Sequence, residues 1–463
     1  MHGIIIKQGP ANFQIIPRQK PVLHLYGNFL GHPQARSRRA EVRMVREDTG
    51  TPVVDWVEAQ QDGLDWTIGF GPIPPGGPYR LETRMICEGP EGSYEQRGDM
   101  VHHLGVGDLF LIAGQSNASG FGQEPVYDPP ELGLSVLREN GRWDLASHPL
   151  CDGTDSIHDN NLEDINPRHA PWLHFARLIK SHTGLPVGLI PASLGGSPIS
   201  RWDLSQEGDL FKTMLRCAGL CGGGPFTGLL WYQGCSDAML GLADGYLESF
   251  RRFVNDARYH LQDPALPVYT VQLNRDVYPF DDPDLSELSA PDMAARWGRF
   301  REVQRQAAKH LNKVYIVPAH DLQLTDNVHN SSSANLVIGQ RVAYSVLQNG
   351  LGIALPGRAP NLSQARQTDG HTIDMTFDDV QGGLSARQAP PGSLAIDVRD
   401  REGAVPLKEI SAWKNIVRIK TARPLQGKVT VSAAAGYDHT GRPPHDTASG
   451  MPLLAFYDAA VEG

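Results

Sequence analysis

The sequence predicts a protein of the α/β class, in which a parallel sheet covered by helices is flanked by two all-β domains. Between about Gly107 and Gly350, continuous apolar stretches alternate with helix-like stretches, which is typical of buried parallel strands. Before and after this region, short stretches rich in β-branched and aromatic residues are separated by turns containing Gly and Pro. The length of 463 residues is that of two or three domains.

Residues 1–106 are predicted to form a β-sandwich-like domain. The candidate strands alternate apolar and polar residues, and turn signals such as Asp62-Gly63 separate them: VLHLYGNF (22–29), AEVRMV (40–45), LDWTIGF (64–70) and YRLETRM (79–85).

Residues 107–352 are predicted to form the α/β domain. Its candidate strands are LFLIAG (109–114), PVGLIPAS (186–193), TGLLWYQG (227–234), PVYTVQLN (267–274) and KVYIVPAH (313–320). Its candidate helices are residues 172–183, 243–261, 295–311 and 333–348. The acidic, Pro-rich stretch 276–293 predicts a long loop near a site, or a lid. The β pattern returns in residues 353–463, which are predicted to form a C-terminal β domain.

Charge and cysteine content narrow the possible partners and location. The chain has 42 Lys and Arg against 52 Asp and Glu, a formal net charge of −10, which argues against nucleic acid or an anionic membrane as partner. No stretch is apolar enough to span a bilayer, and the N-terminus lacks the pattern of a signal peptide. Five cysteines without paired CxxC spacing predict neither a disulfide framework nor a metal site. A cytoplasmic location is therefore predicted.

The stretch LFLIAGQSNASGFG (109–122) places Ser116 just after a buried strand. A serine there can cap a helix, or it can be a nucleophile exposed at the edge of the sheet. The stretch lacks the second glycine of a GxSxG elbow, since Ala118 stands there. The two neighbouring amides, Gln115 and Asn117, are expected to hold the turn or to border a pocket.

Two further loops follow predicted strands and carry candidate oxyanion donors. In ASLGGSPISRW (192–202), the Gly195-Gly196 pair permits a sharp turn that brings an N–H close to a ligand, and Arg201 and Trp202 are expected to line the pocket. In LLWYQGCSDA (229–238), the Gln233 amide can stabilise a developing oxyanion, or it can satisfy loop backbone groups instead.

The last loop, DLQLTDNVHNSSSANL (321–336), holds a carboxylate and an imidazole three residues apart. His329 can act as general base on a serine, and Asp326 can accept from its other ring nitrogen. Asp326 can instead cap the following turn, and Asp321 competes with it for the role of orienting acid. Arg275, which follows the strand ending at Asn274, is also expected to face the site.

In this order, the motifs GQSN, GGSPISRW, WYQGCSD and DNVH resemble the SGNH/GDSL hydrolase superfamily, and more closely its sialate O-acetylesterase-like branch of carbohydrate esterases. PWLHFARLI (171–179) is similar to that branch as well. The resemblance implies a three-layer α/β/α middle domain, a serine esterase activity on acetylated sugars and no metal or organic cofactor.

Carried onto this chain, the resemblance implies Ser116 as nucleophile, His329 as base and Asp326 as its partner. The implied oxyanion donors are the N–H of Ser116, the N–H of Gly195, with Gly196 as rival, and the side chain of Gln233. The implied substrate is an acetylated mono- or oligosaccharide, and Gln115, Asn117, Gly196, Arg201, Trp202 and Arg275 are expected to contact it. A homo-oligomer is compatible with this reading.

One residue departs from the branch, which usually has a glutamate after the QG pair, where this chain has Cys235. The departure affects which sugar is accepted more than the ester chemistry. Two other functions stay open: a carbohydrate-binding protein without activity, and an esterase or lipase of the same superfamily that acts on esters other than sugars.

Overall fold

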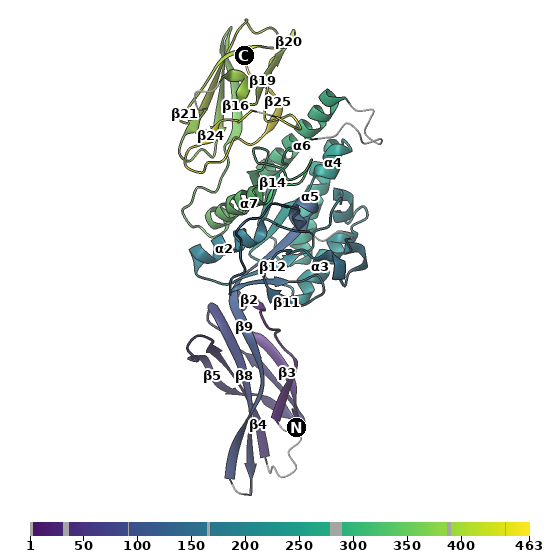
Figure 1. The fold of residues 1–463 in the computed structure, drawn as a ribbon, viewed down its shortest axis with the longest axis vertical. Helices are drawn as coiled ribbons and strands as arrows, with labels where there is room; N and C mark the ends of the chain where they lie inside the picture. The colour runs from purple at the N-terminus through teal and green to yellow at the C-terminus, as the bar shows by residue number, and fades with distance from the viewer. Residues whose placement is uncertain are drawn as a thin grey trace.

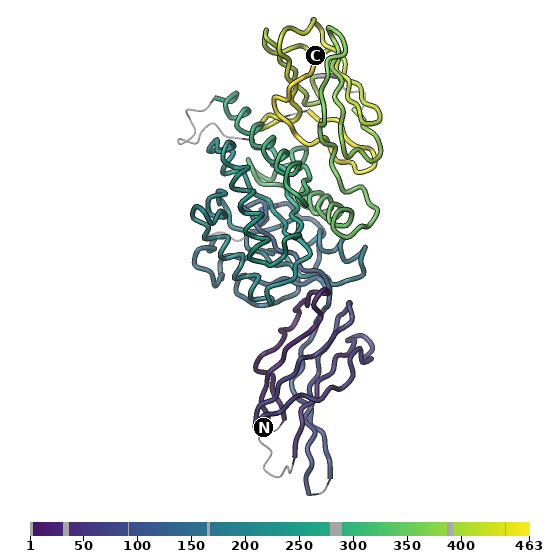
Figure 2. Tube along the Cα trace, turned by 180° about the vertical axis from the view of Figure 1, so that it is seen from behind, coloured from purple at the N-terminus to yellow at the C-terminus, as the bar shows by residue number. Residues whose placement is uncertain are grey.

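The computed structural model describes residues 3–30, 37–90, 92–163, 167–277, 289–386, 390–439 and 441–463. Two β-rich regions lie at opposite ends of an elongated molecule, with an α/β region between them and the two termini far apart (Figures 1 and 2). The α/β class predicted from the sequence is confirmed. Residues 278–288, which make up most of the predicted long loop, lie outside the described residues.

The N-terminal β-rich region contains the strands β1 (Gly3–Gln8), β2 (Ile15–Pro17), β3 (Leu23–Leu30), β4 (Ser37–Arg46), β5 (Pro52–Glu58), β6 (Gln60–Asp62), β7 (Asp65–Phe70), β8 (Gly76–Gly89) and β9 (Gly92–Gly114). One antiparallel group has the order β1–β3–β7–β6, and in the other β4 pairs with β5 and β8, while β8 pairs with β9. Buried side chains of both groups, among them Trp66 and Met85, form a hydrophobic cluster of their own.

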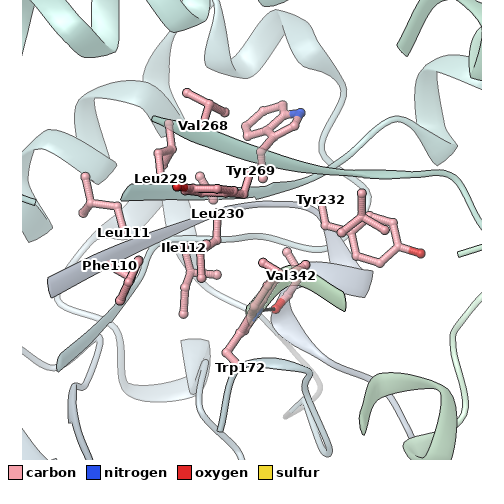
Figure 3. Packing of buried hydrophobic residues seen from close by; sticks show 14 of the residues in the cluster. Phe110, Leu111, Ile112, Trp172, Leu229, Leu230, Tyr232, Val268, Tyr269 and Val342 are labelled. Atoms are coloured by element: carbon pink, nitrogen blue, oxygen red, sulfur yellow. Dashed lines mark hydrogen bonds between the residues drawn. The ribbon is translucent and has the colours of Figure 1, made fainter. Parts of the chain in front are cut away.

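Strand β9 continues from this region into the sheet of the α/β region (Figure 1). The other strands of this sheet are β10 (Leu134–Leu137), β11 (Trp143–Leu145), β12 (Val187–Pro191), β13 (Gly228–Tyr232), β14 (Val268–Gln272) and β15 (Val314–Pro318). Their order is β11–β10–β12–β9–β13–β14–β15, parallel throughout except for β11. The central strands β12, β13 and β14 are buried on both faces, which explains their continuous apolar sequences (Figure 3).

The helices are α1 (Ser116–Ser119), α2 (Trp172–Thr183), α3 (Asp209–Leu220), α4 (Cys235–Met239), α5 (Ala243–His260), α6 (Ala290–His310) and α7 (Ser332–Ser345), the last followed by a π-turn (Val346–Gly350). Helix α6 begins five residues before the predicted stretch. The reason is local: the Ser289 hydroxyl caps it by accepting a hydrogen bond from the Asp292 N–H, and Pro291 suits its first turn. Within the described residues, no helix combines the length and the apolar character that a membrane span needs.

The C-terminal β-rich region contains β16 (Asn361–Asp369), β17 (Thr372–Asp378), β18 (Leu384–Ser385), β19 (Ile396–Asp400), β20 (Gly403–Ala404), β21 (Leu407–Trp413), β22 (Ile416–Thr421), β23 (Thr430–Ala433), β24 (His445–Asp446) and β25 (Phe456–Ala460). Two four-stranded antiparallel sheets, β16–β17–β22–β21 and β20–β19–β23–β25, share a separate hydrophobic cluster. The buried Arg301 of α6 ties this region to the α/β region by donating hydrogen bonds to the carbonyls of Ala434 and Gly436, both at 2.7 Å.

The carboxyl ends of the parallel strands meet at one edge of the sheet, where open α/β sheets place their sites. Gly114 ends β9 with a φ of +136°, and a Cβ on it would lie 2.2 Å from the carbonyl oxygen of Tyr232 on the adjacent strand β13. Only glycine therefore lets β9 turn sharply beside β13 and bring the next residues to the top of the sheet.

Candidate active site

Ser116 is the first residue of α1 and lies two residues beyond the end of β9. Its side chain is almost buried, with 7% of the residue exposed. Its N–H belongs to the first turn of a helix, where no acceptor within the helix is available. Both the hydroxyl and the N–H of Ser116 thus lie at the edge of the sheet where parallel strands end.

Asp326 and His329 form a compact local unit. One carboxylate oxygen of Asp326 accepts hydrogen bonds from the N–H groups of Val328 and His329, at 2.9 and 2.7 Å, and so folds the turn. The other oxygen lies 2.8 Å from Nδ1 of His329. Burial raises the pKa of Asp326, but the hydrogen bonds from the His329 ring and from the two N–H groups outweigh it and lower the pKa overall. An ionised Asp326 favours the His329 tautomer whose Nε2 is free to accept a proton.

Asn117 connects α1 to this turn. Its Nδ2 donates to the carbonyl of Val328 at 3.1 Å, and its Oδ1 accepts from the N–H of Asn330 at 3.0 Å. These bonds reach the residues on either side of His329. The side chain of Asn330 donates both to Asn117 Oδ1, at 2.9 Å, and to the hydroxyl of Tyr232, at 2.8 Å. Hydrogen bonds thus connect the residue after Ser116 to both residues that flank His329. The His329 ring also stacks on Phe121, with 4.8 Å between ring centroids.

The Gly195 N–H is already occupied in this structure. It donates to Oε1 of Glu163 at 2.5 Å. Burial raises the pKa of Glu163, and the Gly195 N–H and the charge of His329 offset part of that increase. Glu163 was not among the residues selected from the sequence, since it lies in a polar loop without a motif and more than 30 residues from its partner.

Gln233 does not point its amide toward an oxyanion. It is fully buried, and its Nε2 donates to the carbonyl of Ser197, at 3.0 Å, and to Oδ2 of Asp237. Asp237 also accepts from the N–H of Ile199, so both side chains hold the loop that carries Gly195. Both amide hydrogens of Gln233 are used by these two bonds, and its role as an oxyanion donor stays a prediction.

Gln115, Asn117 and Trp202 are also buried and turned inward, and their contact with a substrate stays a prediction. Oε1 of Gln115 accepts from the Gly234 N–H at 2.9 Å. Trp202 packs edge-on against Trp231, with 5.3 Å between ring centroids. These side chains hold the loops of the site and do not line its surface.

Three other residues were predicted to contact the substrate: Arg201, Arg275 and Gly196. Arg201 is paired with Asp209 at 2.6 Å, which commits its guanidinium to the loop. Arg275 pairs with Asp438 of the C-terminal region at 3.2 Å, and with Asp326 it lines a cleft of about 480 Å³. Gly196 has a φ of +65° and accepts a hydrogen bond from the Ser236 hydroxyl through its carbonyl.

Cys235 stands where the resemblance leads us to expect a glutamate. Its Sγ lies 3.9 Å from Nδ2 of Asn117 and 3.8 Å from Oδ1 of Asn274. Burial raises the pKa of the thiol to about 12, so the group is neutral near pH 7 and unsuited to be a nucleophile.

Asp128, His148 and His169 lie close enough together to hold a cation. The Ala170 N–H donates to Nδ1 of His148 at 3.3 Å, so neutral His148 carries its proton on Nε2, which faces Asp128 at 3.0 Å. Arg177 pairs with the other oxygen of Asp128. This arrangement is that of a hydrogen-bonded network and leaves Nε2 of His148 without a free lone pair for a metal.

Comparisons with known proteins identify the family of this chain. The family model of a carbohydrate esterase described as sialic acid-specific acetylesterase matches residues 106–348, more than half of the chain. A probable carbohydrate esterase of Arabidopsis thaliana is 26% identical over 279 residues, which cover 55% of this chain and 96% of that protein.

A crystal structure of a carbohydrate acetylesterase from Xanthomonas citri shares the fold, with a TM-score of 0.65 at 20% identity over 96% of this chain and 97% of that one. The shared fold therefore includes the β-rich regions. By the family match, the chain belongs to the carbohydrate esterase family of sialic acid-specific acetylesterases and is a carboxylic ester hydrolase.

Proposed function

We propose that the protein removes acetyl groups from acetylated carbohydrates through an acyl-enzyme intermediate on Ser116. The observation that carries the proposal is the pair of Asn117 hydrogen bonds, which fasten the helix beginning at Ser116 to both neighbours of His329. The contact between His329 Nδ1 and Asp326 supports His329 as general base.

The reaction has two steps. Ser116 Oγ attacks the acetyl carbon while Nε2 of His329 takes the hydroxyl proton, and His329 then protonates the sugar oxygen that leaves. In the second step His329 takes a proton from water, the water oxygen attacks the acyl-enzyme, and acetate leaves as Ser116 Oγ regains its proton.

The oxyanion of each tetrahedral intermediate is proposed to rest on two backbone donors, the N–H of Ser116 and the N–H of Gly195. Fixed donors of this kind each contribute about 3 kcal/mol to transition-state stabilisation. Gln233 is proposed to position the Gly195 N–H, since its hydrogen bonds to Ser197 and Asp237 hold the loop that carries Gly195.

The proposed architecture is a three-layer α/β/α domain over residues 107–352, between β domains over residues 1–106 and 353–463. Separate hydrophobic clusters support this division, since Val106 belongs to the N-terminal cluster and Leu109 to the central one. The first boundary falls within the continuous strand β9, so no flexible linker separates the first two domains.

Asn117→Ala is expected to lower kcat by about 100-fold with a smaller change in KM, because misplacing a base relative to its nucleophile has effects of that size. Steady-state kinetics on an aryl acetate measures both constants. Asn140→Ala is the control, since it removes an amide bonded to Asp155 instead, at 2.8 Å. An unchanged kcat in folded Asn117→Ala would show that the hydrogen bonds of Asn117 to Val328 and Asn330 are not needed for catalysis.

The first test of the proposed function compares aryl acetate, butyrate and octanoate with acetylated oligosaccharides as substrates. Acetyl esters are expected to be hydrolysed fastest, with acetylated sugars preferred over aryl acetate in kcat/KM. Faster hydrolysis of octanoate would favour a lipase-like esterase. Binding of acetylated sugars without release of acetate would favour a carbohydrate-binding protein.

A further inference from the structure

Glu163 lies against Gly195, the proposed oxyanion donor. Its Oε1 accepts from the Gly195 N–H at 2.5 Å. A Cβ on Gly195 would lie 3.1 and 3.3 Å from the two carboxylate oxygens, so the whole carboxylate group covers this glycine. The charge of His329 also lowers the pKa of Glu163, so the carboxylate lies near the proposed base as well as on the proposed oxyanion donor.

The loop that brings Glu163 to this place is anchored. Two residues earlier, Asn161 is fully buried and donates through Nδ2 to the Glu139 carboxylate at 2.7 Å. The Glu163 N–H donates to the carbonyl of Gly153 at 3.3 Å. Across the described ranges, no Lys or Arg forms an ion pair with Glu163, so the backbone N–H of Gly195 is the donor that holds its carboxylate.

A carboxylate on an oxyanion donor has the shape and charge of acetate, the product of the reaction. The carbonyl oxygen of a bound ester needs the same N–H, so substrate and Glu163 compete for it. We propose that Glu163 is a specificity-determining residue. Its carboxylate accepts from the Gly195 N–H until the carbonyl of a neutral ester takes its place, and its negative charge disfavours substrates that carry a carboxylate beside the acetyl group.

The selectivity follows from charge. Once displaced, the Glu163 side chain stays near Gly195, because its backbone is anchored. A second carboxylate on the substrate would then lie within a few ångströms of it in a partly buried site, where like charges repel appreciably. A neutral acetylated sugar meets no such repulsion. This inference rests on the proposed function and narrows its substrates to esters without a neighbouring carboxylate.

The test uses two aryl acetates that differ in one charge, acetylsalicylate and its methyl ester. The wild type is expected to prefer the methyl ester in kcat/KM, and Glu163→Gln is expected to reduce this preference by about tenfold, the change that about 1.4 kcal/mol of charge repulsion produces. The assays are run at pH 8 because burial raises the pKa of Glu163 and a higher pH favours its ionised form. Asp159→Asn removes an exposed carboxylate from the same loop and should leave the preference unchanged.

A second measurement does not depend on turnover. Glu163→Ala vacates the Gly195 N–H, so acetate is expected to bind it at least about tenfold more tightly than it binds the wild type. Titration of sodium acetate, followed by calorimetry, gives both affinities. An unchanged substrate preference in Glu163→Gln together with an unchanged acetate affinity in Glu163→Ala would overturn the inference. If the wild type hydrolyses aryl acetates, that result would leave the proposed function standing, whereas a wild type inactive on every acetyl ester would overturn both.

Discussion

Ser116→Ala is expected to lower kcat by about 10,000-fold or more, because removing the nucleophile of a serine hydrolase leaves only the rate enhancement of binding and of the oxyanion donors. The backbone donors of Ser116 and Gly195 remain in this variant, so KM is expected to change little. Release of acetate from an acetylated oligosaccharide, followed over hours at high enzyme concentration, measures the residual rate.

Ser119→Ala is the matched control for this variant. Ser119 lies in the same short helix, is fully buried, and its hydroxyl contacts the Ser193 hydroxyl at 3.2 Å. Its replacement is expected to cost about 1 kcal/mol of the free energy of unfolding and to leave kcat nearly unchanged. Equal losses of kcat in the two variants would indicate a structural role for Ser116. Trapping of an acyl-enzyme on Ser116 in the wild type would exclude a purely structural role.

Asp326→Asn is expected to lower kcat by about 100- to 10,000-fold, because an amide at this position favours the wrong tautomer of His329 and no longer stabilises its protonated form. The variant also changes the response to acid. Since the pKa of Asp326 is lowered in the folded protein, its ionised form stabilises the fold at pH values above its unfolded pKa. That stability is lost as the pH falls through the folded pKa, and Asp326→Asn is expected to lack this part of the pH dependence.

Asp321→Asn separates the two aspartates that the sequence leaves as rivals. Both oxygens of Asp321 contact the guanidinium of Arg341, each at 2.7 Å, so this carboxylate is committed to α7. Its replacement is expected to lower the free energy of unfolding by about 2 kcal/mol with little change in kcat. Thermal unfolding and kinetics on the same samples distinguish the variants. A larger loss of kcat in Asp321→Asn than in Asp326→Asn would reverse the assignment.

Much of the fold can be read from the sequence because it depends on local patterns. Continuous apolar stretches predict the buried parallel strands β12 to β15, and the helix-like pattern of residues 243–261 corresponds to α5 within one residue at its end. The start of α6 was missed, since its first turn depends on Ser289 and Pro291 and not on an apolar face. The continuity of β9 between two regions was also missed, because Gly105 and Gly107 within it resemble a break between two strands.

The contact between Asp326 and His329 also follows from the sequence. The two residues are three positions apart, and an aspartate that accepts hydrogen bonds from the next N–H groups brings its carboxylate close to the side chain three residues on. The types of residue at the strand ends, a serine, a glycine pair and an amide, likewise identify the edge of the sheet where chemistry is expected.

What only the tertiary structure decided is the direction of each polar side chain at that edge. Gln233 and Asn117 are both amides beside strand ends, yet one binds inward to the Gly195 loop and the other reaches residues more than 200 positions away. Glu163 covers Gly195 although no motif connects them. A sequence pattern determines which groups are present and where backbone turns occur. Which donor meets which acceptor depends on how distant loops pack, since a buried polar group takes whatever partner the fold brings within hydrogen-bond distance.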